Sequence, residues 1–173
     1  MAAQILVAFA TRNGSTAEIA QAIGKELIST GYPADIAEIK TISTLAGYRA
    51  VVIGGPLYMG SVDGDVGKFI GKNREQLQKL SVAAVAVGRA PTNTDPDAVG
   101  IAMAALKKSL EPVTPVVSVM FAGKLDPKKL SFIQRKITEL VKSPAGDFRD
   151  WTLIASWAHD LPGKMGLVPP PKN

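Results

Sequence analysis

Hydrophobic residues along this chain fall into short continuous runs, separated by segments with helical periodicity. Four runs are rich in valine and isoleucine, do not alternate with polar residues, and are bounded by glycine, threonine or proline. They are residues 5–10, 50–53, 82–87 and 116–122. Such runs are typical of parallel strands covered on both faces. A fifth segment, residues 34–39, alternates apolar and polar positions, which indicates an edge strand with one solvent-exposed face.

Helical patterns fill the gaps between these strands. Residues 15–30 place apolar side chains on one face, and Ser15 to Glu18 fits a capping box at the start. Similar patterns cover residues 65–80 and a segment that opens at Asp95-Pro96 and ends before Pro112. Because strand and helix alternate, the sequence predicts an α/β fold with right-handed crossovers.

The pattern changes after the last strong strand, where two helical stretches follow instead of one. They cover about residues 128–142 and 148–161, so one of them is an added helix. Residues 162–173 include three consecutive prolines and are expected to lie extended or disordered, because proline cannot continue a helix. We therefore predict a single domain over residues 1–161 and a proline-rich C-terminal tail.

Composition narrows the chemistry that this domain can perform. The chain has 173 residues, no cysteine and one histidine, His159. The lack of cysteine excludes a thiol nucleophile, a disulfide framework and a cysteine-ligated iron–sulfur cluster. A lone histidine disfavours a histidine metal cage or a Ser-His-Asp hydrolase, and no metal ligands are expected. The chemistry is therefore expected to come from a bound cofactor.

The net charge of +5 favours anionic partners and is unevenly distributed. Residues 106–142 hold eight basic residues against three acidic ones, an excess equal to that of the whole chain. The N-terminus lacks a basic leader region, and its apolar run is too short to span a membrane. We therefore expect a soluble, cytoplasmic protein without a nucleic-acid partner.

The loop after the first strand is the strongest candidate for ligand binding, because ligands of doubly wound sheets bind beyond the carboxyl ends of the strands. Residues 11–16 read Thr-Arg-Asn-Gly-Ser-Thr and lead into a helix, whose N-terminus favours a phosphate. The loop lacks the GxGxxG and GxxxxGK[ST] spacings, which disfavours dinucleotides and nucleoside triphosphates and leaves a monophosphate. The alternative is an ordinary strand-to-helix turn rich in capping residues.

Two further loops are expected at the same edge of the sheet. After the third strand, Gly54-Gly55 permits close backbone approach. The flat and polarizable groups that follow suit a stacked planar ring, although they also suit packing under the next helix. The fourth strand ends at Gly88 and continues into a polar, proline-bearing loop.

These loops resemble the cofactor site of the flavodoxin-like family. Residues 11–16 are similar to its Thr-x-(Thr/Asn)-Gly-x-Thr loop for the FMN phosphate, and residues 52–60 resemble its flavin-flanking loop. Over residues 4–161 the chain also resembles the branch that includes menaquinone-dependent protoporphyrinogen dehydrogenases, through Ala122-Gly123, the added helix and Asp150-Trp151. The resemblance implies a doubly wound, five-stranded parallel sheet in the order 2-1-3-4-5, with helices on both faces and noncovalent FMN.

The resemblance also assigns the residues that would hold FMN. Hydroxyl and backbone donors would bind the phosphate, with a positive side chain nearby: Thr11, Arg12, Asn13, Gly14, Ser15 and Thr16. A second group would line the isoalloxazine, with Tyr58 as the stacked ring: Pro56, Leu57, Tyr58, Met59 and Gly60. Backbone N–H groups of a third would face the pyrimidine edge: Gly88, Arg89 and Ala90. No side chain is expected to act as acid, base or nucleophile.

Two departures from the small electron carriers of this family bear on function. Those carriers are typically acidic and hold the flavin between two aromatic rings, whereas this chain is basic and its 88–96 loop has no aromatic residue. A cation such as Arg89 near the ring would stabilise the reduced anionic flavin by about 1–4 kcal/mol, unless it points to solvent.

These features favour a flavin-dependent oxidoreductase that acts on a flat or quinone-type substrate, including a protoporphyrinogen dehydrogenase-like activity. The alternatives are a non-catalytic carrier of single electrons between redox proteins and an interaction domain without FMN.

The added helix and the final helix raise the question of partners. Residues 128–142 carry an apolar face, with basic residues mainly elsewhere. Either that face packs on the domain, or the helix docks on an anionic membrane or an acidic partner, close to a membrane quinone. Trp151 and Trp157 are expected to pack the final helix, with a homodimer contact as the alternative.

Overall fold

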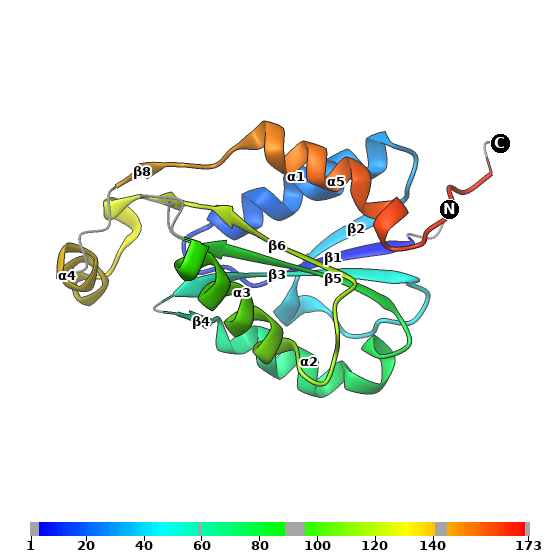
Figure 1. The fold of residues 1–173 in the computed structure, drawn as a ribbon, viewed down its shortest axis with the longest axis horizontal. Helices are drawn as coiled ribbons and strands as arrows, with labels where there is room; N and C mark the ends of the chain where they lie inside the picture. Colours follow the sequence, from blue (N-terminus) through cyan, green and yellow to red (C-terminus); the bar gives the residue numbers. More distant parts are fainter. Residues whose placement is uncertain (1–3, 59, 89–95, 141–144, 172–173) are drawn as a thin grey trace.

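A five-stranded parallel sheet forms the centre of the protein, shown in a computed structural model that describes residues 4–58, 60–88, 96–140 and 145–171 (Figure 1). The parallel strands are β1 (Ile5–Phe9), β2 (Ala34–Glu38), β3 (Ala50–Tyr58), β5 (Ser81–Gly88) and β6 (Val117–Ala122). They lie in the order β2-β1-β3-β5-β6. Since β4 (Ser61–Val62) is a short strand antiparallel to β3, this is the predicted order 2-1-3-4-5.

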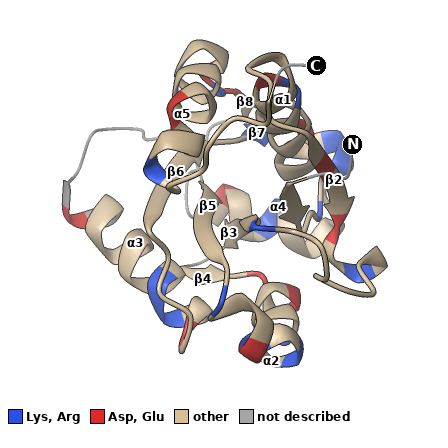
Figure 2. Cartoon of the chain, turned by 90° about the vertical axis from the view of Figure 1, so that its right-hand side faces the viewer, with Lys and Arg blue, Asp and Glu red and all other residues tan. Residues whose placement is uncertain are grey.

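Two layers of helices cover the sheet, which confirms the doubly wound architecture. Helices α1 (Ser15–Ser29) and α5 (Trp151–Lys164) lie on one face, and α2 (Gly64–Leu77) and α3 (Pro96–Leu110) lie on the other (Figure 1). Strand β1 contributes to both cores, because Ile5 and Val7 pack under α1 while Leu6 and Ala8 face the α2 side. Strands β1, β3 and β5 contain no charged residue, and Figure 2 shows the charged positions on the surrounding helices and loops.

Strand β3 is longer than the predicted run of residues 50–53. It continues through Gly54, Gly55 and Pro56, which the sequence marks as a break, and pairs with β5 as far as Pro56 opposite Val87. The chain then folds back as β4, with Leu57 opposite Val62, and Gly60 turns it with φ +74°. Pairing on both sides therefore outweighs the weak strand propensity of glycine and proline.

The segment between β6 and α5 is an insertion closed by a small hairpin. Strand β7 (Lys124–Leu125) pairs antiparallel with β8 (Gly146–Asp147), and between them lie the short 3-10 helix η2 (Pro127–Lys129) and helix α4 (Phe132–Leu140). The added helix is therefore present, but within the described residues it is shorter than the predicted 128–142. It stands beyond the carboxyl ends of the strands (Figure 1).

The predicted packing of the apolar face of the added helix on the domain holds only in part. Ile133 and Leu140 are 70% and 84% exposed, as is Phe132 at 73%, whereas Ile137 is half-buried and Leu130, just before the helix, is buried. No helix of the described residues has both the length and the apolar character needed to cross a bilayer.

The prediction that an extended or disordered tail starts at Pro162 is also wrong, because the first residues of that segment are helical or buried. Helix α5 begins at Trp151, after Asp150 caps it by accepting a hydrogen bond from the Leu153 N–H, and runs through Pro162 to Lys164. Met165 and Leu167 are then buried in the core beside α1. Burial of these side chains outweighs the tendency of proline to end a helix.

A glycine pair in β3 gives a test of the packing against α2. A Cβ on Gly55 would lie 2.7 Å from Val66 Cγ2, whereas one on Gly54 would meet no atom closer than 3.8 Å. We expect Gly55→Ala to lower the free energy of unfolding by about 1–3 kcal/mol through overpacking, and Gly54→Ala to change it much less. Urea unfolding of the two variants measures the difference, and equal stabilities would contradict the packing described.

Candidate functional site

The loop of residues 11–16 is a tight turn that starts α1. The N–H of Gly14 donates to Thr11 Oγ1 at 3.0 Å, and its carbonyl accepts from the N–H of Glu18 at 3.1 Å. Gly14 is the N-cap residue, with φ +91°, a conformation that favours glycine. It offers no capping side chain, so the predicted capping box is wrong. The first-turn N–H groups of α1 therefore remain available to a ligand.

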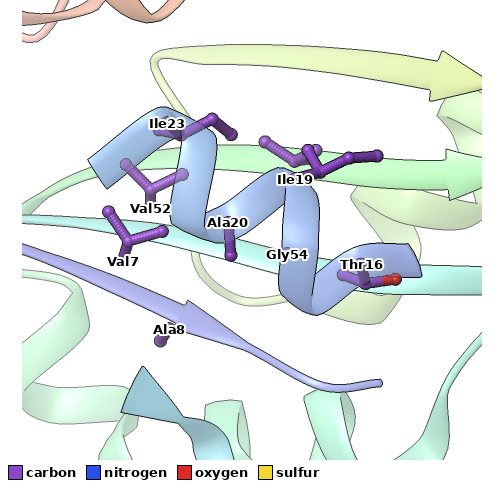
Figure 3. Close-up of a pocket in the computed structure, with 9 residues that line it drawn as sticks. Val7, Ala8, Thr16, Ile19, Ala20, Ile23, Val52 and Gly54 are labelled. Carbon is purple, nitrogen blue, oxygen red and sulfur yellow. The ribbon is translucent and has the colours of Figure 1, made fainter. Parts of the chain in front are cut away.

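Two hydroxyl side chains follow Gly14 and are held differently. Thr16 is 4% exposed; its methyl group packs near Gly54, and its hydroxyl points away from the other residues around a small apolar cavity (Figure 3). That cavity, of about 10 Å³ beneath α1, is far too small for a cofactor. Ser15 Oγ accepts a hydrogen bond from the backbone N–H of Lys124 at 3.3 Å. The loop is thereby joined to the base of the insertion.

An ion pair fixes the other side of the loop. Arg12 Nε donates to Asp63 Oδ2 at 2.6 Å, and the Asp63 side chain is 5% exposed. Asp63 also caps α2 by accepting from the N–H of Asp65 at 2.9 Å. Its hydrogen bond and charge raise the pKa of Arg12. Arg12 thus lies in the loop as expected, but its positive charge is balanced by a buried carboxylate.

The ends of β3 and β5 supply the second and third predicted groups of site residues. Tyr58 is 42% exposed at the end of β3, while Pro56 and Leu57 are half-buried and Gly60 forms the exposed turn. The Gly88 carbonyl accepts from the Gly123 N–H at 3.0 Å, which joins the ends of β5 and β6. Three members of these groups lie outside the described residues: Met59, Arg89 and Ala90.

Glycine is needed at position 123, where the insertion begins. A Cβ there would lie 2.8 Å from Ser15 Oγ and 3.0 Å from Val87 Cγ1. On the other side of the insertion, the N–H of Phe148 donates to the Gly123 carbonyl at 3.2 Å. The 11–16 loop, the end of β5 and both ends of the insertion therefore meet at one point.

Arg149 is the second anchor of the insertion, and no local sequence pattern predicts this role. Its guanidinium pairs with Glu18 in the first turn of α1 and with Asp147 at 2.6 Å, and it lies over the Trp151 ring. These contacts raise the pKa of Arg149 and lower the pKa of Asp147 to about 2. Glu18, an acid close to the start of α1, is thereby paired with a cation.

The lone histidine and the tryptophans have structural surroundings. His159 Nδ1 lies 3.2 Å from Glu26 Oε1, between the exposed surfaces of α5 and α1. Trp157 packs edge-on against Phe121, with ring centroids 5.7 Å apart, as expected for a side chain that packs the final helix. Trp151 is 43% exposed beneath Arg149. None of these residues belongs to the strand-end loops.

Comparison with known proteins identifies the family. The model of the flavodoxin domain matches residues 6–152, most of the chain. The chain belongs to the flavodoxin domain family. FMN is the cofactor of this family. The protein is therefore an FMN-binding electron-transfer protein, which exchanges electrons with a redox partner.

Individual relatives are more distant. A curated relative is the protoporphyrinogen IX dehydrogenase [quinone] of Escherichia coli (strain K12), which is 26% identical over 170 residues and aligns over 90% of this chain and 93% of its own length. A flavodoxin from the domain Archaea matches with a TM-score of 0.56 at 14% identity, over 94% of this chain and 98% of that one. A Lactobacillus acidophilus flavoprotein in complex with FMN matches with a TM-score of 0.53 at 11% identity, over 69% and 93%. These structures share the fold.

Proposed function

We propose that FMN binds across the three strand-end loops and that the protein oxidises a porphyrinogen-type donor with a quinone as acceptor. The observation that carries the proposal is the uncapped N-terminus of α1, which lies at the junction of the 11–16 loop, the end of β5 and the insertion. An uncapped helix start of this kind binds phosphate.

The donors at the 11–16 loop fit a phosphate. Thr11 Oγ1 and Ser15 Oγ already accept hydrogen bonds from backbone N–H groups, so their own hydroxyl protons remain to be donated. The nearby carboxylates of Glu18 and Asp63 are paired with Arg149 and Arg12. A phosphate at this position would therefore meet donors, and the charges of Glu18 and Asp63 would already be balanced by the two arginines.

The remaining predicted residues would hold the isoalloxazine. In this proposal the exposed ring of Tyr58 stacks on it, Leu57 and Pro56 support the hairpin behind, and the backbone at Gly88 faces its polar edge. Met59, Gly60, Arg89 and Ala90 complete the proposed set. Bound FMN supplies the redox chemistry, while the chain binds and orients it.

The substrate class rests on the curated relative. A protein called protoporphyrinogen IX dehydrogenase [quinone] aligns over nearly the whole of both chains, although only 26% of the aligned residues are identical. A single exposed tyrosine at the end of β3 is compatible with a flat substrate at the other face of the flavin. The competing function is a carrier of single electrons between redox proteins.

The phosphate position is tested by removing its hydroxyl donors. Ser15→Ala combined with Thr16→Ala should weaken FMN binding by a few kcal/mol, since a hydrogen bond to a charged group contributes roughly 1.5–3 kcal/mol. Riboflavin, which lacks the phosphate, should bind both proteins equally. Ser29→Ala, at the far end of the same helix, serves as the control. Fluorescence titration gives the affinities, and an unchanged FMN affinity would place the phosphate elsewhere.

The proposed reaction is tested with the FMN-loaded protein. It should oxidise protoporphyrinogen in the presence of a menaquinone analogue faster than free FMN at the same concentration. A rate no higher than that of free FMN would remove this activity. An anaerobic reductive titration then distinguishes the functions, because a two-electron oxidoreductase should be reduced in one step and a single-electron carrier in two resolved steps.

The exposed face of α4 supports a membrane-associated form of this function. We assign it to anionic lipid, because Phe132, Ile133 and Leu140 are exposed beside the cations Arg135 and Lys136. Lys136 Nζ lies 4.8 Å from the centre of the Phe132 ring, so this cation shares the apolar face, as snorkelling lysines do. Docking through α4 would bring the carboxyl edge of the sheet to a quinone in the bilayer.

Vesicle binding tests this assignment. The wild-type protein should co-sediment with vesicles that contain anionic lipid, and Ile133→Asp combined with Leu140→Asp should abolish the binding. Ile28→Asp on α1 is the matched control, because Ile28 is also an exposed isoleucine, at 51%. Equal losses in the two proteins, or no binding by the wild type, would contradict docking through α4. Sedimentation velocity would reveal self-association through the same face.

A further inference from the structure

The insertion places a lysine over the start of α1. Lys129 is the last residue of η2, and its Nζ lies 3.9 Å from the position that a Cβ on Gly14 would occupy. Gly14 is the N-cap of α1 and lies in the 11–16 loop. A cation from a distant part of the sequence therefore reaches the loop to which the phosphate is assigned above.

Local hydrogen bonds hold the turn that carries Lys129. Asp126 caps it: its Oδ1 accepts from the N–H of Lys128 and its carbonyl accepts from the N–H of Lys129, each at 3.0 Å. Arg135 Nε donates to the Pro127 carbonyl at 2.8 Å, which ties the turn to α4. Leu130, the next residue after η2, is buried. The position of Lys129 is thus defined by its own turn.

The base of the insertion is fixed to the same helix start. The Lys124 N–H binds Ser15 Oγ, and Arg149 pairs with Glu18, so both ends of the insertion are attached to the first turn of α1. These contacts determine where η2 lies relative to Gly14. Lys129 approaches the loop because the insertion as a whole is anchored there.

The charge of Lys129 lacks the ion-pair partners that the arginines Arg12 and Arg149 have. Arg12 is balanced by Asp63 and Arg149 by Glu18 and Asp147, whereas no carboxylate of the described residues forms an ion pair with Lys129. The N-terminus of a helix carries partial positive charge, so an ammonium group placed over it is unfavourable unless an anion lies between them. The arrangement therefore fits an anion bound by both.

We propose that Lys129 binds the FMN phosphate, so that the insertion completes the cofactor site. This inference rests on the proposed position of the phosphate in the 11–16 loop. The phosphate then joins two parts of the chain, since α1 supplies N–H and hydroxyl donors from one side and η2 supplies an ammonium group from the other. Lys129 would thereby help to select FMN over flavins that lack a phosphate.

The experiment compares FMN with riboflavin on the full-length apoprotein. Lys129→Gln should weaken FMN binding about tenfold, equivalent to about 1.4 kcal/mol, and leave riboflavin binding unchanged. Lys128→Gln removes the same charge from the same turn and should leave both affinities unchanged. Lys129→Arg should retain most of the FMN affinity. The effect of Lys129→Gln should shrink at high salt, because salt screens an exposed charge.

Three outcomes would overturn the proposal. If Lys129→Gln leaves FMN affinity unchanged while Ser15→Ala with Thr16→Ala lowers it, the phosphate position stands and the role of Lys129 fails. Equal losses of FMN and riboflavin in Lys129→Gln would mean that the side chain only supports the structure. If neither set of substitutions affects FMN selectively, the phosphate lies elsewhere and both proposals fail.

Discussion

The left-handed turn at Gly14 is the constraint on which the candidate site depends. It carries the chain from β1 into α1 without a capping side chain, so the helix begins with N–H groups that only water or a ligand can satisfy. The neighbouring elements attach at this turn: α2 through Arg12 and Asp63, and the insertion through Ser15 and Glu18. The site is therefore assembled around one backbone conformation.

Ion pairing decides the electrostatics of this junction more than the net charge of +5 does. Asp63 and Glu18 would each repel a bound anion, but a guanidinium neutralises each of them. The two pairs also link separate elements, so removing either cation would both loosen the loop and leave an uncompensated acid beside the proposed phosphate position. Arg12 and Arg149 thus combine charge compensation with a structural role.

Local sequence patterns predict the strands, the helices and the loops that join them, but not the contacts between distant residues. The apolar runs located the strands, and the resemblance of residues 11–16 and 52–60 to a known family supplied the strand order and the loops. The pairs Arg12 with Asp63 and Glu18 with Arg149 were not predictable, because their members are far apart in sequence. The continuation of β3 through Pro56 and of α5 through Pro162 depends on tertiary packing, which outweighs local propensity.

The hairpin of β7 and β8 brings the start and the end of the insertion together. Gly123 and Phe148 are hydrogen-bonded to each other, so the chain leaves the sheet and returns to α5 at a single point. A segment with adjacent ends can be lengthened, shortened or exchanged in evolution without moving the elements beneath it, because the entropy of loop closure grows slowly with length. The sheet and its four covering helices can thus stay constant while the surface at the carboxyl edge of the sheet changes.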